Sequence, residues 1–258
     1  MTFVRLAREE HVATVTLARP EALNAISTDV ADELAGAFLQ TAADPSVWAV
    51  ILAAEGAKAF CVGADLKERN QLDDAGWMRN RVFMRAMFES IRSAPQPTIA
   101  SVFGYALGGG FELALSCDFI VTADDAILGL PETRVGIVPG GGGTQLLGRR
   151  VGISRAKRIV LAGERIGAEE GHDIGLVDRV VERTALPAAT EELARQIVAN
   201  SPVGVREAKS AIERGWSLSM EDAIQLEELA WLRAVASEDR REGIAAFNEK
   251  RAPRWSGR

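Results

Sequence analysis

Alternating and continuous runs of apolar residues predict strands in the first half of the chain. Residues 11–17 alternate between apolar and polar side chains and are rich in β-branched residues, which is typical of a strand. The continuous apolar run at 47–52 indicates a strand that is covered on both faces. Two further strands are predicted at 98–103 and 119–122.

Helical periodicity separates these strands. Ser27 or Thr28 is the expected N-cap of a first helix, which buries Leu34 and Phe38 on one face. Residues 77–92 carry their large apolar side chains at helical spacing. Strands and helices that alternate in this way are typical of an α/β fold.

The rest of the chain is predicted to form glycine-rich loops and helices. The stretches 104–110 and 130–143 are expected to be loops, with a short helix at 111–116 between them. From about residue 144 onward we expect helices alone, at 143–150, 154–162, 168–174, 187–200, 202–215, 219–236 and 240–250. The chain is therefore predicted to be an α/β protein with a helical C-terminal layer.

Composition excludes several classes of protein. The chain has 258 residues, of which 47% are hydrophobic and 26% charged, as in an ordinary globular protein. The formal net charge of −6 argues against general binding to nucleic acid, because that affinity comes mainly from neutralising phosphates. Two basic stretches, 146–158 and 240–258, stand out against this acidity. They either hold a small phosphorylated ligand or form solvated helix faces.

The cysteines, the histidines and the hydropathy of the chain indicate which cofactors and which cellular location to expect. Cys61 and Cys117 form no CxxC motif, and His11 and His172 have no partner at metal-ligand spacing. We therefore expect neither a disulfide framework nor a metal site. The N-terminal residues lack the apolar region of a signal peptide, and no apolar run approaches the roughly 20 residues that span a membrane. A cytoplasmic protein without a membrane partner is expected.

Two glutamates carry the candidate chemistry. Glu112 follows three glycines, 108–110, in the first turn of a predicted helix, where unpaired N–H groups favour developing negative charge. Burial would raise the pKa of Glu112 and the helix end would lower it. Glu132 lies 20 residues further on, directly after the apolar residues Leu130 and Pro131. Either the two carboxyls converge on one cleft for acid–base catalysis, or they are a surface acid and a loop acid.

Other glycine-loop and triad chemistries do not fit the sequence. The glycines at 104 and 108–110 do not form G-x-G-x-x-G, and Glu132 follows a Leu-Pro loop in place of a second strand. Gly140–Gly143 do not precede the lysine of a phosphate-binding loop, and there is no G-x-S-x-G. A nicotinamide enzyme and a serine hydrolase are therefore disfavoured.

Three motifs in order resemble the crotonase family, the enoyl-CoA hydratase/isomerase superfamily. They are FCVGADL at 60–66, GYALGGGFELA at 104–114, and the segment from Pro131-Glu132 to the PGGGGTQ run at 139–145. The resemblance covers nearly the whole chain. It implies a spiral of ββα units over 1–200 and a helical region at 201–258 that assembles trimers, alone or paired into hexamers.

The resemblance also implies roles for particular residues. The amides matching Ala64 and Gly109 form an oxyanion hole for a thioester carbonyl, Glu112 deprotonates water, Glu132 protonates C2, and Gly140 helps to position the water. Asp118 is expected to form structural hydrogen bonds. Coenzyme A enters as part of the substrate, with no permanently bound cofactor. The residues implied beside coenzyme A are Ala64, Asp65, Leu66, Lys67 and Gly109, and Trp231 and Lys250 of a neighbouring subunit.

The two glutamates favour hydration of a 2-enoyl-CoA to a 3-hydroxyacyl-CoA. An isomerase, a dehydratase or lyase acting on a specialised acyl-CoA, and a binding module without turnover are the alternatives. The resemblance places the acyl pocket partly along residues 70–90. The large side chains of that segment either limit the acyl chain or belong to the core; they are Trp77, Phe83, Met84 and Phe88. The acyl group is therefore left open.

Overall fold

The structure is a computed structural model that describes residues 2–258. Its larger sheet has six strands in the order β1-β2-β3-β5-β7-β10, in which only the β1–β2 pair is antiparallel. These strands are β1 (Val4–Glu9), β2 (Val12–Leu17), β3 (Ala49–Ala54), β5 (Thr98–Val102), β7 (Phe119–Ala123) and β10 (Arg179–Val181). A smaller sheet has the order β4-β6-β8-β9, and its strands are β4 (Ala59–Cys61), β6 (Tyr105–Leu107), β8 (Ile127–Gly129) and β9 (Arg165–Gly167).

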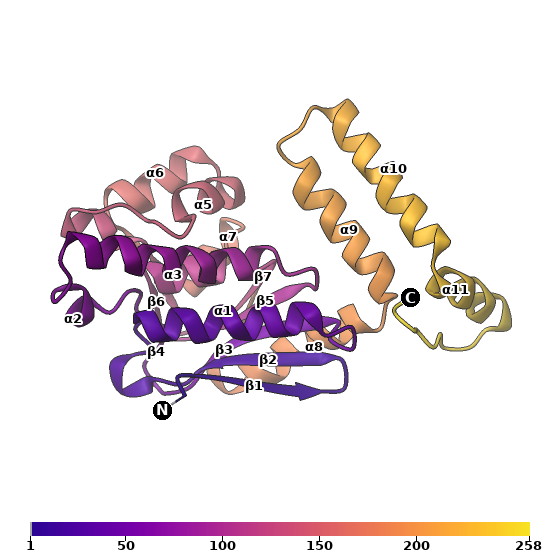
Figure 1. The fold of residues 1–258 in the computed structure, drawn as a ribbon, viewed down its shortest axis with the longest axis horizontal. Helices are drawn as coiled ribbons and strands as arrows, with labels where there is room; N and C mark the ends of the chain where they lie inside the picture. Colours follow the sequence, from indigo (N-terminus) through magenta and orange to yellow (C-terminus); the bar gives the residue numbers. More distant parts are fainter. Residues whose placement is uncertain (1) are drawn as a thin grey trace.

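Helices cover both faces of the larger sheet (Figure 1). The helices of the core are α1 (Thr28–Ala43), α2 (Leu66–Arg69), α3 (Asp74–Arg92), α4 (Gly109–Leu115), α5 (Gly143–Val151), α6 (Ile153–Leu161), α7 (Ala168–Asp173) and α8 (Leu186–Val198). Short 3₁₀ turns occupy Pro20–Ala22, Pro131–Val135 and Arg183–Ala185. Val50 and Leu52 of β3 pack with α1, α3 and α4, whereas Ala49 and Ile51 pack with α8. The prediction that this strand is covered on both faces is confirmed.

Three helices follow the core. They are α9 (Pro202–Gly215), α10 (Met220–Ala236) and α11 (Glu238–Glu249). The α9–α10 pair stands apart from the two sheets, and α11 and the C-terminus lie beside its base (Figure 1). Lys209 of α9 joins this region to the core, since its Nζ donates to Asp118 Oδ2 at 2.7 Å and to the Gln96 carbonyl at 3.0 Å. The predicted division at residue 200 stays a prediction.

Two sequence-based expectations were wrong. Helices do not stand alone after residue 144, because β9 and β10 lie there, and the loop expected at 104–110 contains β6. Each of these strands has three residues, too few to show a period of two. The first strand of the chain, β1, was also missed, because its charged side chains leave five of its six residues exposed.

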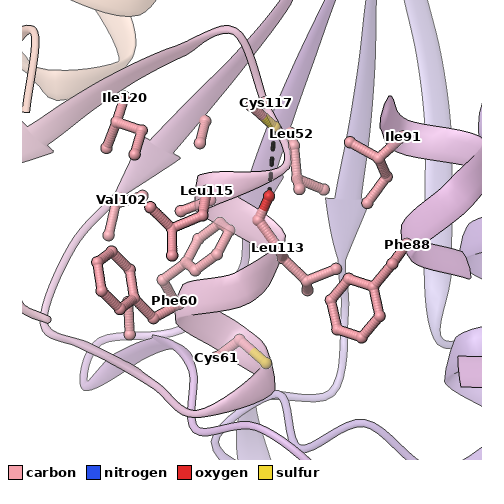
Figure 2. Close-up of a cluster of buried hydrophobic side chains, with 14 of the residues drawn as sticks. Leu52, Phe60, Cys61, Phe88, Ile91, Val102, Leu113, Leu115, Cys117 and Ile120 are labelled. Atoms are coloured by element: carbon pink, nitrogen blue, oxygen red, sulfur yellow. Dashed lines mark hydrogen bonds between the residues drawn. The ribbon is translucent and has the colours of Figure 1, made fainter. Parts of the chain in front are cut away.

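Helix α4 is the central element of the hydrophobic core. Figure 2 shows Leu113 on the side of Phe88 and Ile91 of α3, and Leu115 on the opposite side, toward Val102. Gly110 lets this helix approach β4, because a Cβ at that position would lie 2.1 Å from the Cys61 carbonyl oxygen. The first turn of α4 is therefore fixed against the strand that leads into the FCVGADL motif.

Candidate active site

A cavity of about 940 Å³ lies where the sequence motifs meet. The main chain of Gly63 and Ala64 and the first turn of α4 line one wall, and α3 lines another. The 131–144 segment completes the enclosure. Of the residues that the sequence singles out for chemistry, the cavity is lined by Ala64, Leu66, Gly109, Glu112, Glu132 and Gly140. Of the large side chains in 70–90, Trp77, Met84 and Phe88 line it and Phe83 does not. The structure thus brings together in one space residues from three motifs that are far apart in the chain.

Two backbone amides face this cavity beside each other. An added Cβ at Gly109 would lie 3.8 Å from the Ala64 nitrogen, so the two segments are in close contact. Within residues 2–258, neither the Ala64 amide nor the Gly109 amide donates a hydrogen bond to a protein acceptor. Gly63 makes this approach possible: its φ is +89°, and a Cβ there would lie 2.9 Å from the Gly109 nitrogen. Two N–H groups are therefore available to an oxygen atom of a ligand.

Glu112 is held by the loop before α5. Its Oε1 accepts hydrogen bonds from the Gly141 amide at 2.6 Å and the Gly143 amide at 2.8 Å. Burial raises the pKa of Glu112, and the amides of Gly143, Gly141 and Gly140 and the charge of Arg81 oppose this effect only in part. Burial therefore outweighs these hydrogen bonds and this charge in setting the pKa of Glu112.

Glu132 is the second buried carboxyl group at the cavity. It lies in the 3₁₀ turn Pro131–Val135, and its Oε1 would be 3.3 Å from a Cβ placed on Gly108. Its Oε2 is buried and has no partner within residues 2–258. The pKa of Glu132 is raised to about 7, mainly by burial and also by the nearby charge of Glu112, while its own backbone amide and Arg69 oppose the shift. One glutamate is thus oriented by amides and the other is biased toward its protonated form.

Helices α4 and α5 are connected at both of their ends. At one end, Glu112 of α4 accepts from the Gly141 and Gly143 amides at the start of α5. At the other end, Arg150 of α5 donates to the carbonyl oxygens of Cys117 and Asp118, each at 2.9 Å. Sequence reasoning missed Arg150 and the two glycine amides, because these partners are 29 or more residues apart in the chain.

The family model for enoyl-CoA hydratase/isomerase matches residues 7–258. The chain belongs to this family. A putative enoyl-CoA hydratase/isomerase of Bacillus subtilis is 41% identical over 97% of this chain and 96% of its own length. A short-chain-enoyl-CoA hydratase of Clostridium acetobutylicum is 39% identical over 96% and 95%. The crystal structure of an enoyl-CoA hydratase from Bacillus anthracis, 39% identical, superposes with a TM-score of 0.97 over 99% of this chain and 100% of that one.

These matches confirm the crotonase-family assignment and its α/β fold. Four residues expected beside coenzyme A do not line the cavity, and their contacts with coenzyme A stay predictions. Asp65 caps α2 and pairs with Arg19 at 2.7 Å, and Lys67 is exposed outside the cavity wall. Trp231 lies on α10, and Lys250 follows α11. The expectation for Trp231 and Lys250 concerns a neighbouring subunit, so it stays a prediction.

Asp118 has the structural role expected of it. Its Oδ2 accepts from the Thr98 amide at 2.7 Å and from Lys209 at the same distance. Among residues 2–258 no group of three or more His, Cys, Asp and Glu residues is arranged to hold a metal ion. Over the same part of the chain, no helix combines the length and the apolar character needed to cross a membrane.

Proposed function

We propose that this family member is an enoyl-CoA hydratase, which adds water to the 2,3 double bond of a 2-enoyl-CoA to give a 3-hydroxyacyl-CoA. The observation that carries the proposal is the shared cavity of two free amides and two buried glutamates. The thioester oxygen accepts from the Ala64 and Gly109 N–H groups, which stabilises the enolate that forms in the transition state. A hydratase needs a base and an acid beside such a carbonyl, and Glu112 and Glu132 are those groups.

In the proposed reaction, ionised Glu112 takes a proton from water while the water oxygen bonds to C3. Electrons of the double bond move onto the thioester oxygen as an enolate. Protonated Glu132 then supplies the proton at C2, and the carbonyl reforms. A Glu132 pKa of about 7 allows this group to carry a proton near neutral pH. Gly140 belongs to the proposed water site, since it lies in the cavity wall next to the Gly141 amide.

The direct test is turnover of crotonyl-CoA by the purified protein. Loss of the conjugated thioester absorbance and formation of 3-hydroxybutyryl-CoA, heavier by one water, are expected. Conversion of a 3-enoyl-CoA to its 2-enoyl isomer without a hydroxylated product would establish an isomerase in its place. Binding of the thioesters without any conversion would leave only a binding module.

Gly109 offers a test of the oxyanion donor. Gly109→Pro removes one N–H at the first position of a helix, where proline is tolerated. We expect kcat to fall about 10²- to 10³-fold, the effect typical of losing one oxyanion donor. Gly109→Ala is the matched control, because it keeps the N–H and its Cβ would meet nothing closer than 3.4 Å. Equal activity of the two variants would refute the role of this amide.

The C-terminal helices supply the proposed oligomer interface, in trimers or dimers of trimers. Large apolar side chains on α9, α10 and α11 are exposed, among them Ile212, Trp216, Ile224, Trp231 and Phe247, the last at 84%. Apolar surface of this extent is typical of an interaction site. Further copies of this chain are the proposed occupants, and Trp231 and Lys250 the groups they lend to a neighbour's acyl-CoA. Sedimentation should give a trimer or hexamer, and Phe247→Glu with Ile212→Glu should give monomers.

A further inference from the structure

Two arginines, Arg69 and Arg81, line the wall of the cavity. Arg69 ends α2 and lies over the Trp77 ring at 4.9 Å, and Arg81 projects from α3. Within residues 2–258 neither forms an ion pair, and Arg69 Nε is buried without a hydrogen-bond acceptor. Arg79 and Arg92 of the same helix α3 do pair, with Asp73 and Glu89 respectively.

Both arginines lie close to the reacting groups. A Cβ on Gly140 would be 3.2 Å from a terminal nitrogen of Arg81, and Gly140 adjoins the amide that holds Glu112. The charge of Arg81 lowers the pKa of Glu112, and the charge of Arg69 lowers that of Glu132. The two guanidinium groups are therefore within electrostatic reach of the atoms that would add water.

Arg81 belongs to α3, which lines a different wall from the thioester amides. Gly109 adjoins Ile26 and Gly63, whereas Arg81 adjoins Gly140, which precedes the amide that holds Glu112. The charge of Arg81 also lowers the pKa of Arg69, so the two guanidinium groups are near each other. With the carbonyl at the amides and C2 and C3 at the glutamates, an acyl chain that continues past Glu112 toward Gly140 would reach them. The diphosphate of coenzyme A is separated from the thioester by the long pantetheine arm, and so from groups that lie beside C2 and C3. The anion that can reach these arginines is therefore on the acyl chain.

The charge of the cavity favours such an anion. Its charged lining residues are four arginines and two glutamates, in a protein whose net charge is −6. Many other residues of the cavity wall are apolar; they include Met84, Phe88, Val135, Ile137 and Val138. A plain alkyl chain would exclude water from the guanidinium groups without offering their N–H groups an acceptor, which carries a desolvation cost. A carboxylate would supply acceptors to both guanidinium groups.

We propose that Arg69 and Arg81 bind a carboxylate at the far end of a short acyl chain. The preferred substrate would then be the mono-CoA thioester of a short unsaturated dicarboxylic acid. This inference rests on the proposed function, because it takes the thioester carbonyl to lie at Ala64 and Gly109. The arginines have no part in the bond-making steps and act on substrate selection.

The test compares two thioesters of equal size. Glutaconyl-CoA carries a carboxylate one carbon beyond the double bond, and its carboxamide analogue is neutral and nearly isosteric. For the wild-type protein we expect kcat/KM to favour glutaconyl-CoA by about tenfold to a hundredfold, the range of a charge-assisted hydrogen bond. Arg69→Gln and Arg81→Gln should each reduce this preference, and the double variant should abolish it while still hydrating the carboxamide.

Arg85→Gln is the matched control, because Arg85 lies one turn beyond Arg81 on α3, is exposed and does not line the cavity. It should keep the wild-type preference. Binding of saturated glutaryl-CoA, its carboxamide and free coenzyme A, measured by calorimetry, adds a readout that does not require turnover. The Arg69 and Arg81 variants should weaken only glutaryl-CoA.

Each failure has its own signature. Wild-type hydration of the carboxamide at equal or higher kcat/KM overturns the inference and leaves the hydratase proposal standing. An equal loss of turnover with both thioesters would mean that the arginines only tune the glutamates, and an equal loss of coenzyme A binding would assign them to its phosphates. Either result refutes carboxylate recognition. Binding that prefers glutaryl-CoA without any hydration refutes the hydratase proposal instead.

Discussion

Replacing Glu112 by glutamine tests its proposed role as a base while keeping the hydrogen bonds that hold its side chain. The carbonyl oxygen of glutamine can take the position of Oε1 and accept the same N–H groups from Gly141 and Gly143, now at 2.6 and 2.8 Å. The side chain loses its capacity to take a proton from water. General-base catalysis typically contributes 10²- to 10⁴-fold, so we expect kcat for crotonyl-CoA to fall by at least about 100-fold.

The same substitution should affect stability only slightly. Two charge-assisted hydrogen bonds become neutral ones, which costs about 1 kcal/mol each. Glutamine carries no charge, so the variant avoids the desolvation cost that raises the pKa of Glu112, and this offsets part of the loss. We therefore expect the unfolding free energy to fall by less than about 2 kcal/mol.

Glu112→Ala is the contrasting variant. It removes the acceptor altogether and leaves two buried N–H groups unpaired, at about 1–3 kcal/mol each. The assay follows crotonyl-CoA absorbance at saturating thioester, with urea unfolding of each variant by circular dichroism. If the glutamine variant keeps its rate within about threefold of wild type, Glu112 is not the base. If the glutamine and alanine variants lose the same stability, the two amides do not hold this side chain as described.

Three other predictions concern pH, attachment of the C-terminal helices and glycine packing. Because the pKa of Glu132 is raised to about 7, kcat/KM should decline as pH rises above about 7, where the acid loses its proton. The unfolding free energy should also fall as pH rises from about 4.5 through 7, because the folded state holds this proton more tightly than the unfolded state. The pH profiles of Glu132→Gln should lack both effects. Lys209→Met leaves Asp118 without its cation and should lower the unfolding free energy, measured with urea, by about 3 kcal/mol. Lys157→Met, at an exposed position, is the control and should change it by less than about 0.5 kcal/mol. Gly110→Ala places a Cβ 2.1 Å from the Cys61 oxygen and should abolish folding or lower the unfolding free energy by more than about 3 kcal/mol. Gly36→Ala is the control, because Gly36 is an exposed position of α1 with open space around it. It should stabilise the protein by about 0.5–1 kcal/mol and raise its melting temperature.

The larger elements were predictable from the sequence because each carries its own local signal. Ser27 is the N-cap of α1 and accepts from the Val30 amide, and the helix buries Leu34 and Phe38 as its periodicity indicates. The continuous apolar run that contains β3 indicated burial on both faces. Strands of three residues carry no such signal, so the smaller sheet was not predicted at all.

The candidate site was predictable in its residues and not in its contacts. Motif resemblance named Glu112 and Glu132, but their distance in sequence gives no pKa, since that depends on burial by segments far away in the chain. Arg69 and Arg81 passed unnoticed because isolated arginines on helices are ordinary surface residues in sequence. Only the folded chain brings them to the same cavity as the glutamates.

The double connection between α4 and α5 has a consequence for how new activities can arise on this scaffold. The Gly141 and Gly143 amides belong to the backbone, and Arg150 anchors the far end of their helix independently of residue 112. A lineage that exchanges Glu112 for another side chain therefore inherits an intact pair of inward-facing donors. The two N–H groups can then donate to an oxygen atom of a ligand. Loss of the base therefore leaves a second site for an anion without a change in the backbone.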